Sequence, residues 1–262
     1  MRWLRSYSPA LLFGAALLGL WEWLVAQYDV PAYVLPAPHL ILHAAQSQAA
    51  ELRAAAWITI QITAQALFWA VTLGLGLAIL FTRARIVERV LYPYVVILQV
   101  TPVVAIAPLV LIWVGFDNVN RALVIIAWIV AFFPILTNAV SGLRAVDPNL
   151  RDLFKLYNAT PLQTLLKLEL PSALPQILTG VKISGGLALI GAIVAEFVAG
   201  SGNSTGLAWR IIETGNRLDI AGLFASLLLL SGIGIGLFYL LSLAEWLSLR
   251  KWHPAYQKQG NG

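Results

Sequence analysis

The chain contains no cysteine and few charged residues. Only 11% of its 262 residues are Asp, Glu, Lys or Arg, whereas soluble proteins carry about 25%. Without cysteine, disulfides and thiol catalysis are excluded. No glycine is followed by lysine, so the phosphate-binding pattern G-x-x-x-x-G-K-[ST] does not occur. What is abundant is apolar: 60% of the residues are hydrophobic and the mean hydropathy is +0.80, a composition typical of a membrane protein.

Six stretches are long and apolar enough to cross a bilayer. A hydrocarbon core of about 30 Å requires about 20 residues of helix, and each span must be helical because lipid cannot solvate unpaired backbone groups. The sequence therefore predicts an all-α polytopic membrane protein, with residues 1–262 forming a single transmembrane domain. The first stretch is longer than the apolar part of a cleaved signal, so we interpret it as a retained span. The six predicted spans are residues 8–27, 57–81, 90–114, 121–142, 176–198 and 221–247.

The distribution of Lys and Arg predicts the orientation of the chain. With the N-terminus inside, 12 of the 17 basic residues lie on the inner side and four on the outer side, while Lys182 lies within the fifth span. We therefore expect a multi-pass protein of the bacterial inner (plasma) membrane with both termini cytoplasmic. The net charge of +5 is then an orientation signal, and no nucleic acid partner is expected because no soluble basic surface is present.

The longest inner loop joins the fourth and fifth predicted spans and contains an amphipathic pattern. Residues 152–175 read DLFKLYNATPLQTLLKLELPSALP. Asp147 followed by Pro148 is typical of an N-cap and a first-turn proline, and Asn158 can adopt the left-handed conformation that ends a helix. The apolar residues of this first short helix recur at helical spacing and are Leu150, Leu153, Phe154 and Tyr157.

A second short helix is predicted directly afterwards. Thr160 and Pro161 provide its start, and we expect Pro171 and Pro175 to stop it before the fifth span. Its apolar side contains Leu162, Leu165, Leu166 and Leu168. The two helices could rest in the membrane interface or dock onto a soluble partner, and the pattern alone does not distinguish these alternatives.

The same loop resembles the cytoplasmic signature of the inner-membrane permease subunits of binding-protein-dependent ABC importers of type I. That signature reads Glu-Ala-Ala, three residues, Gly, nine residues and Ile-x-Leu-Pro. Asp and Asn stand here for Glu and Gly, which preserves the charge and the turn chemistry, and the spacing is kept while several identities differ. The corresponding positions are Asp152, Leu153 and Phe154, then Asn158, then Leu168, and finally Leu170 and Pro171.

Further stretches resemble one branch of that family. They are QVTPVVAIAPLVLIWVG at residues 99–115, FFPILTNAVSGLRAVDPNL, LALIGAIVAEFVAG and the tail KWHP, so that the resemblance covers about residues 57–254. The branch imports nitrate, sulfonates, taurine and thiamine-pyrimidine precursors. The wording around TPVVAIAPL favours the members that carry pyrimidine precursors.

The resemblance implies that residues 147–170 form coupling helices that sit in a cleft of a cytoplasmic ATPase. The chain itself is then not an enzyme and needs no cofactor, because ATP and Mg belong to the partner ATPase subunits. The other implied partners are a second permease copy, as a homodimer, membrane lipid, and a periplasmic or lipid-anchored substrate-binding protein. The residues implied in ATPase coupling are Asp152, Leu153, Phe154, Tyr157, Asn158, Ala159, Leu162, Leu168 and Pro171.

Two prolines in the third predicted span indicate either a packing kink or a translocation path. Each removes a helical hydrogen bond, at about 3 kcal/mol in a soluble helix, and a membrane tolerates this where neighbours or a cavity satisfy the carbonyls. Glu196 in the fifth span needs a partner or a water-filled path unless it lies at the outer interface. The candidate path residues are Gln99, Thr101, Pro102, Pro108, Thr137, Asn138, Ser141, Ser184 and Glu196.

Other classes of protein fit the sequence less well. An ion-coupled secondary transporter would use Glu22 or Glu196 as its coupling carboxylate, but no inverted repeat is visible. Residues 202–206 formally match a nucleophile elbow, which requires a strand-to-helix turn, and we expect an outer loop there. His39 and His43 lie four apart on an expected amphipathic helix without a third ligand nearby, so no metal site is predicted.

Overall fold

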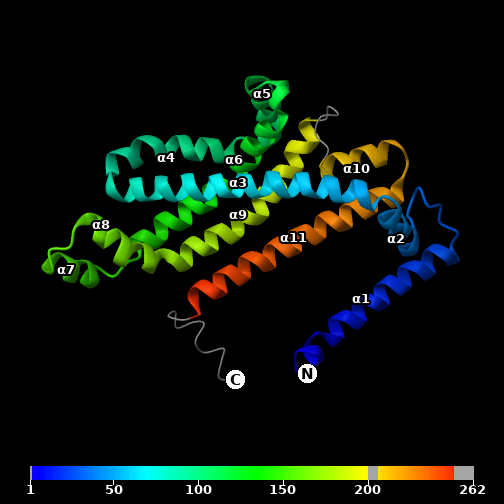
Figure 1. Ribbon diagram of the computed structural model, residues 1–262, viewed down its shortest axis with the longest axis horizontal. Helices are drawn as coiled ribbons and strands as arrows, with labels where there is room; N and C mark the ends of the chain where they lie inside the picture. The colour runs from blue at the N-terminus through cyan, green and yellow to red at the C-terminus, as the bar shows by residue number, and fades with distance from the viewer. Residues whose placement is uncertain (1, 200–205, 251–262) are drawn as a thin grey trace. The chain divides into compact units, whose positions relative to one another are not determined.

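The computed structural model describes residues 2–199 and 206–250, and within these residues every regular element is a helix (Figure 1). The predicted all-α fold is confirmed. In chain order the helices are α1 (Arg2–Gln27), α2 (Pro38–Ser47), α3 (Ala49–Arg83), α4 (Arg85–Val100), α5 (Val103–Val114), the 3-10 turn η1 (Phe116–Asn118), α6 (Val119–Arg144), α7 (Pro148–Leu156), α8 (Pro161–Thr164), the π-helical turn η2 (Leu165–Glu169), α9 (Leu170–Ala199), α10 (Leu207–Asn216) and α11 (Ile220–Leu249).

Four helices in the described residues are long and apolar enough to cross a membrane, and a bent pair brings the number to five. They are α3, α6, the continuous helix Pro161–Ala199 and α11, which contain the second, fourth, fifth and sixth predicted spans. The first predicted span lies within α1, whose apolar stretch Leu12–Gln27 is shorter than a full span.

The third predicted span is wrong as a single helix. It divides into α4 and α5, which meet at an angle of 104° around Thr101 and Pro102. Pro102 has no N–H to continue the ladder, and its ring forces the preceding residue out of the helical region, so Thr101 is extended with ψ 126°. The carbonyl of Ile97 accepts from both the backbone N–H of Thr101, at 3.1 Å, and its hydroxyl, at 2.7 Å, so Thr101 closes the last turn of α4.

The described chain divides into two compact units. The second unit consists of Thr59–Ser204 and Ile233–Gly262, and its centre is the contact between α6 and α9. A Cβ built on Gly191 would lie 2.8 Å from the Cα of Ala127, and one on Gly180 would lie 3.0 Å from the carbonyl oxygen of Pro134. These distances show that the backbones of α6 and α9 approach closely at Gly180 and Gly191, as small residues allow in membrane helices.

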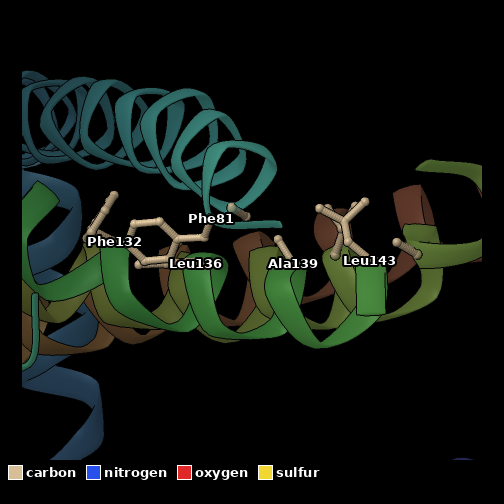
Figure 2. Close-up of a cluster of buried hydrophobic side chains, with 8 residues drawn as sticks. Phe81, Phe132, Leu136, Ala139 and Leu143 are labelled. Carbon is tan, nitrogen blue, oxygen red and sulfur yellow. The ribbon is translucent and has the colours of Figure 1, made fainter. Parts of the chain in front are cut away.

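A hydrophobic cluster extends this contact toward α3 (Figure 2). Phe81 from α3 lies against Phe132 and Leu136 of α6, and the aliphatic residues of α9 complete the cluster. Lys182 of α9 forms an ion pair with Glu245 of α11 at 3.0 Å and lies 5.0 Å from the ring centroid of Phe238. A charge within a span thus has a partner inside the protein, as the cost of an unpaired charge in lipid requires.

The first unit consists of Met1–Ile58 and Thr205–Gly232. Its α2 confirms the amphipathic helix expected around His39, whereas α10 was not predicted. The largely buried Arg210 of α10 forms an ion pair with Glu51 and donates to the Oε1 of Gln48 at 2.8 Å. Gln48 in turn donates to Asp219 at 2.8 Å, so one polar network joins α10 to the ends of its neighbours.

Gly191→Ala is expected to destabilise the chain by about 1–3 kcal/mol, because the new methyl group must displace the backbone of α6. Gly186→Ala in the same helix is the matched control, since a Cβ there would meet no atom within 4 Å. In that position alanine is expected to stabilise the helix by up to about 1 kcal/mol. Unfolding of the purified chain in detergent measures both changes, and equal effects of the two substitutions would contradict the close α6–α9 contact.

Candidate coupling segment and translocation path

We call residues 147–170 the α7–α8 segment, which leaves the end of α6 and leads into α9 (Figure 1). The side chain of Asp147 caps α7 by accepting from the backbone N–H of Asn149 at 2.8 Å, and Pro148 occupies the first turn. Both features were predicted from the sequence. The cap satisfies an otherwise open N–H group and fixes where α7 begins.

Asn158 ends α7 in the left-handed conformation, with φ 51°. The N–H of Asn158 donates to the carbonyl of Lys155, and the N–H of Ala159 donates to that of Phe154, both at 2.9 Å. This pair of bonds is a Schellman motif, in which Asn or Gly takes the left-handed position. The prediction that Asn158 supplies the turn chemistry of the signature glycine is confirmed.

The next helix starts as predicted but does not stop as predicted. Thr160 and Gln163 form a reciprocal capping box around Pro161. Helix then continues through η2 into α9, so the expected stop at Pro171 and Pro175 is wrong. In η2 the N–H of Leu170 donates to Leu165, five residues back, and the shifted register lets Pro171 stand in a first helical turn, where its missing N–H costs little.

The outer surface of the α7–α8 segment exposes several large apolar side chains beside charged ones such as Asp152 and Lys155. Tyr157 is 79% exposed and Leu162 is 63% exposed, and Leu153 and Leu156 also face solvent. By contrast, Phe154 is half-buried. Leu168, another residue implied in coupling, is buried within η2. Of the residues implied in coupling, Tyr157 and Leu162 are therefore among those with accessible side chains, whereas Leu168 is not.

Sequence reasoning missed Glu169, which connects this segment to the rest of its unit. Its buried carboxylate lies 2.5 Å from an amino group of Arg83 and 3.5 Å from the Nε of Arg151. Arg151 also donates to the carbonyl of Leu143 at 2.7 Å, and Arg83 to that of Pro161 at 3.5 Å. One carboxylate thus links the end of α3, helix α7 and the π-helical turn. The signal in the sequence was a lone acidic residue in the apolar part of the signature.

The candidate path residues of the third span lie along the break. Gln99 is exposed at the end of α4 and Pro108 is exposed on α5. Thr101 lines a groove of about 460 Å³ together with aromatic and aliphatic residues of α4, α5 and α6. Pro102, which causes the break, is exposed. The structure therefore gives the two prolines different roles, because Pro102 ends a helix while Pro108 lies within one.

The polar candidates on α6 lie at a second hollow. Thr137 and Ser141 line a cavity of about 300 Å³ together with Tyr92 and Arg144. The hydroxyl of Thr137 donates to the carbonyl of Phe133 at 3.1 Å. Asn138 does not line this cavity in the described structure, and its side chain amide donates to the carbonyl of Pro134 at 2.8 Å.

Ser184 and Glu196 lie inside the helix packing rather than on an open surface. Each has 0% exposure. Glu196 accepts a hydrogen bond from the hydroxyl of Thr59 at 2.8 Å, so of the two interpretations of this residue the structure supplies the protein partner. Within the described residues the hydroxyl of Ser184 has no hydrogen-bond partner.

The residues considered for a metal site, for ion coupling and for a nucleophile elbow do not belong to the α7–α8 segment or to the candidate path along α4, α5 and α6. The Nδ1 of His39 lies 2.5 Å from a carboxylate oxygen of Glu22, which joins the two residues considered for a metal site and for ion coupling. Among the described residues, no three His, Asp or Glu side chains form a group that could hold a metal ion. Residues 202–205 of the formal nucleophile-elbow match, and the KWHP tail, lie outside the described residues.

A family model agrees with the resemblance on which the sequence interpretation rested. The model for binding-protein-dependent transport system inner membrane components matches residues 70–251. This range contains the α7–α8 segment and every candidate path residue.

Individual relatives match nearly the whole chain. A probable ABC transporter permease protein of Haemophilus influenzae is 32% identical over 93% of this chain and 96% of its own length. A formylaminopyrimidine transport permease protein of Halalkalibacterium halodurans is 32% identical, over 88% and 91%. A putative aliphatic sulfonates transport permease protein of Bacillus subtilis is 30% identical, over 96% and 90%.

Glu169→Gln is expected to loosen the α7–α8 segment, because two arginines lose the charge that holds them. Amide hydrogen exchange of residues 148–164 is expected to accelerate by about tenfold, the equivalent of about 1.4 kcal/mol in local opening. Asp152→Asn is the control, since its ion pair with Lys155 is largely exposed and contributes little. Equal exchange in the wild type and in Glu169→Gln would show that the carboxylate does not hold the segment.

Proposed function

Because this chain belongs to the family of inner membrane components of binding-protein-dependent transport systems, and is a permease subunit of an importer-type ABC transporter, we propose that its α7–α8 segment docks onto a cytoplasmic ATPase. Family membership also sets aside the secondary transporter considered from the sequence. The segment transmits the motion of the ATPase to the membrane spans. The chain itself catalyses no covalent reaction.

One observation carries the proposal. Tyr157 and Leu162 are exposed on two capped helices whose relative position is fixed by a Schellman motif and a capping box. Large apolar residues on a rigid support are the usual anchors of a protein interface. A segment that only rested on lipid would not need both helix ends to be fixed in this way.

Glu169 supports the transmission of motion in this proposal. A displacement of α7 moves Arg151, and Arg151 is joined through Glu169 to Arg83 at the end of α3. The continuous helix from Pro161 through Ala199 carries the same displacement along α9. Glu169 is thus a positioning residue, whereas Tyr157 and Leu162 contact the partner.

The partners follow from this mechanism. We propose two ATPase subunits that bind ATP and Mg, a second copy of this permease, and a substrate-binding protein on the opposite side of the inner membrane. The counts of Lys and Arg support an orientation with both termini and the α7–α8 segment in the cytoplasm. The exposed polar and proline residues along the broken third span, together with Thr137 and Ser141, are the proposed lining of the translocation path.

For the substrate, we propose a pyrimidine precursor of thiamine. The stretch TPVVAIAPL supports this choice, and one relative is named for formylaminopyrimidine transport. Another relative is named for aliphatic sulfonates, which makes sulfonates the competing choice.

The double substitution of Tyr157→Ala and Leu162→Ala is expected to abolish co-purification of the ATPase while membrane insertion is retained. Each anchor contributes about 2 kcal/mol, so each loss weakens assembly by a factor of about 30. Affinity purification from solubilised membranes, with the bound ATPase quantified per inserted permease, measures the effect.

Tyr28→Ala with Leu42→Ala is the matched control, because it removes the same residue types from exposed positions outside the segment. That variant is expected to retain the ATPase. A Tyr157 and Leu162 variant that inserts and binds the ATPase normally would rule out these anchors. Poor insertion with normal ATPase binding per molecule would instead support a lipid-resting segment.

Cells that express the complete transporter are expected to accumulate labelled formylaminopyrimidine, and unlabelled alkanesulfonate in large excess is expected not to compete. The same cells without this permease give the background. Accumulation of the sulfonate with no uptake of the pyrimidine would assign the transporter to the other branch and leave the coupling mechanism unaffected.

A further inference from the structure

A cleft of about 670 Å³ in the second unit is lined almost wholly by charged residues. Its lining comes from the end of α3, the first turns of α4, the end of α6, α7 and η2. The lining residues are Thr82, Arg83, Arg85, Glu88, Arg89, Arg144, Arg151 and Glu169.

The charges in this cleft do not balance. Five arginines face two glutamates, which leaves three positive charges in excess. Glu169 forms ion pairs with Arg83 and Arg151, and Glu88 forms one with Arg144 at 2.6 Å. In the part of the chain that the structure describes, no carboxylate lies within ion-pair distance of the other two arginines. Like charges gathered in one hollow repel one another unless an anion joins them.

The two uncommitted arginines are Arg85 and Arg89, which stand one helical turn apart at the start of α4. Arginine presents a planar fork of N–H donors that matches the oxygens of a phosphate group. The same helix also exposes an apolar stripe, in which Ile86 and Val90 directly follow the two arginines and Tyr94 and Ile97 continue along the helix. Two arginines suited to a phosphate group thus lie beside a surface suited to a hydrocarbon chain.

We propose that this cleft binds the phosphate of an anionic phospholipid, with Arg85 and Arg89 as its principal donors. The acyl chains lie along the exposed stripe of α4. The alternation of arginine and aliphatic residues at the start of α4 favours a lipid over free phosphate, because a free phosphate ion has no apolar group that could contact the apolar stripe. Basic pockets at the ends of membrane helices bind such headgroups. The principal donors, Arg85 and Arg89, are not among the residues proposed to dock onto the ATPase, although the cleft also contains the arginines that hold Glu169.

The test is a titration of the purified full-length chain with phosphatidylglycerol or phosphatidylcholine, followed by native mass spectrometry. The wild type is expected to bind phosphatidylglycerol in preference. Arg85→Gln with Arg89→Gln is expected to weaken phosphatidylglycerol binding by about 25-fold, since each arginine near an anionic lipid surface contributes about fivefold. Phosphatidylcholine binding is expected to remain unchanged.

Arg53→Gln with Arg217→Gln removes the same charge from exposed positions of the other unit and is expected to bind lipid as the wild type does. If the glutamine variant does not insert, Arg85→Lys with Arg89→Lys is measured instead. That variant keeps the charge and loses the planar fork, so weaker phosphatidylglycerol binding is again expected. Equal affinity of the wild type for the two lipids overturns the proposal without any variant.

Two further measurements separate the sources of the anion. Inorganic phosphate, added at constant ionic strength, is expected to compete weakly with phosphatidylglycerol. If phosphate alone binds and the lipid does not, the site serves a soluble anion and the lipid proposal is wrong. If the purified ATPase displaces the lipid, the arginines belong to a protein interface, which also overturns the proposal.

Discussion

The close contact between α6 and α9 is the interaction on which the second unit depends. Gly180 and Gly191 let the two backbones approach within the reach of a single methyl group, and without a hydrophobic driving force in lipid such packing is what holds membrane helices together. Because the end of α6 and the start of α9 both belong to this contact, the chain between them must leave the pair and return to it. The α7–α8 segment is the connection between the two helices, so the end of α6 and the start of α9 determine where it lies.

Ion pairs then hold the α7–α8 segment in place. Glu169 places one carboxylate among groups from α3, α7 and η2. Hydrophobic contacts alone would let short helices slide, since an apolar surface has no preferred register. An ion pair between fixed positions removes that freedom. The same arginines that hold the segment also create the excess positive charge of the cleft, so the support of the segment and the anion site share their residues.

The sequence predicted those features that depend on local chemistry. The Asp147 cap, the Asn158 turn and the Thr160 start each follow from the few residues around them. The features that it did not predict depend on residues far apart in the chain. Pro102 and Pro108 within residues 90–114 indicated a packing kink as one alternative but not a bend of 104°, because hydropathy does not show whether surrounding groups satisfy the carbonyls that a proline leaves unpaired. Glu169 was missed for a similar reason, since Arg83 precedes it by 86 residues.

The departures from the family signature can be understood in the same way, by separating what the local backbone requires from what depends on other surfaces. Its spacing is a property of the backbone: the left-handed residue must follow α7, and the capping box and the π-helical turn must occupy the residues between Asn158 and Leu170. Asn serves the turn as well as Gly does, so that position can change without moving either helix. The identities of Asp152, Leu153 and Tyr157 are different in kind, because these side chains are exposed and touch little of their own chain. In the docking that we propose, their identity is set by the ATPase surface that they meet, and that surface has to fit this chain's residues rather than the Glu-Ala-Ala of the signature.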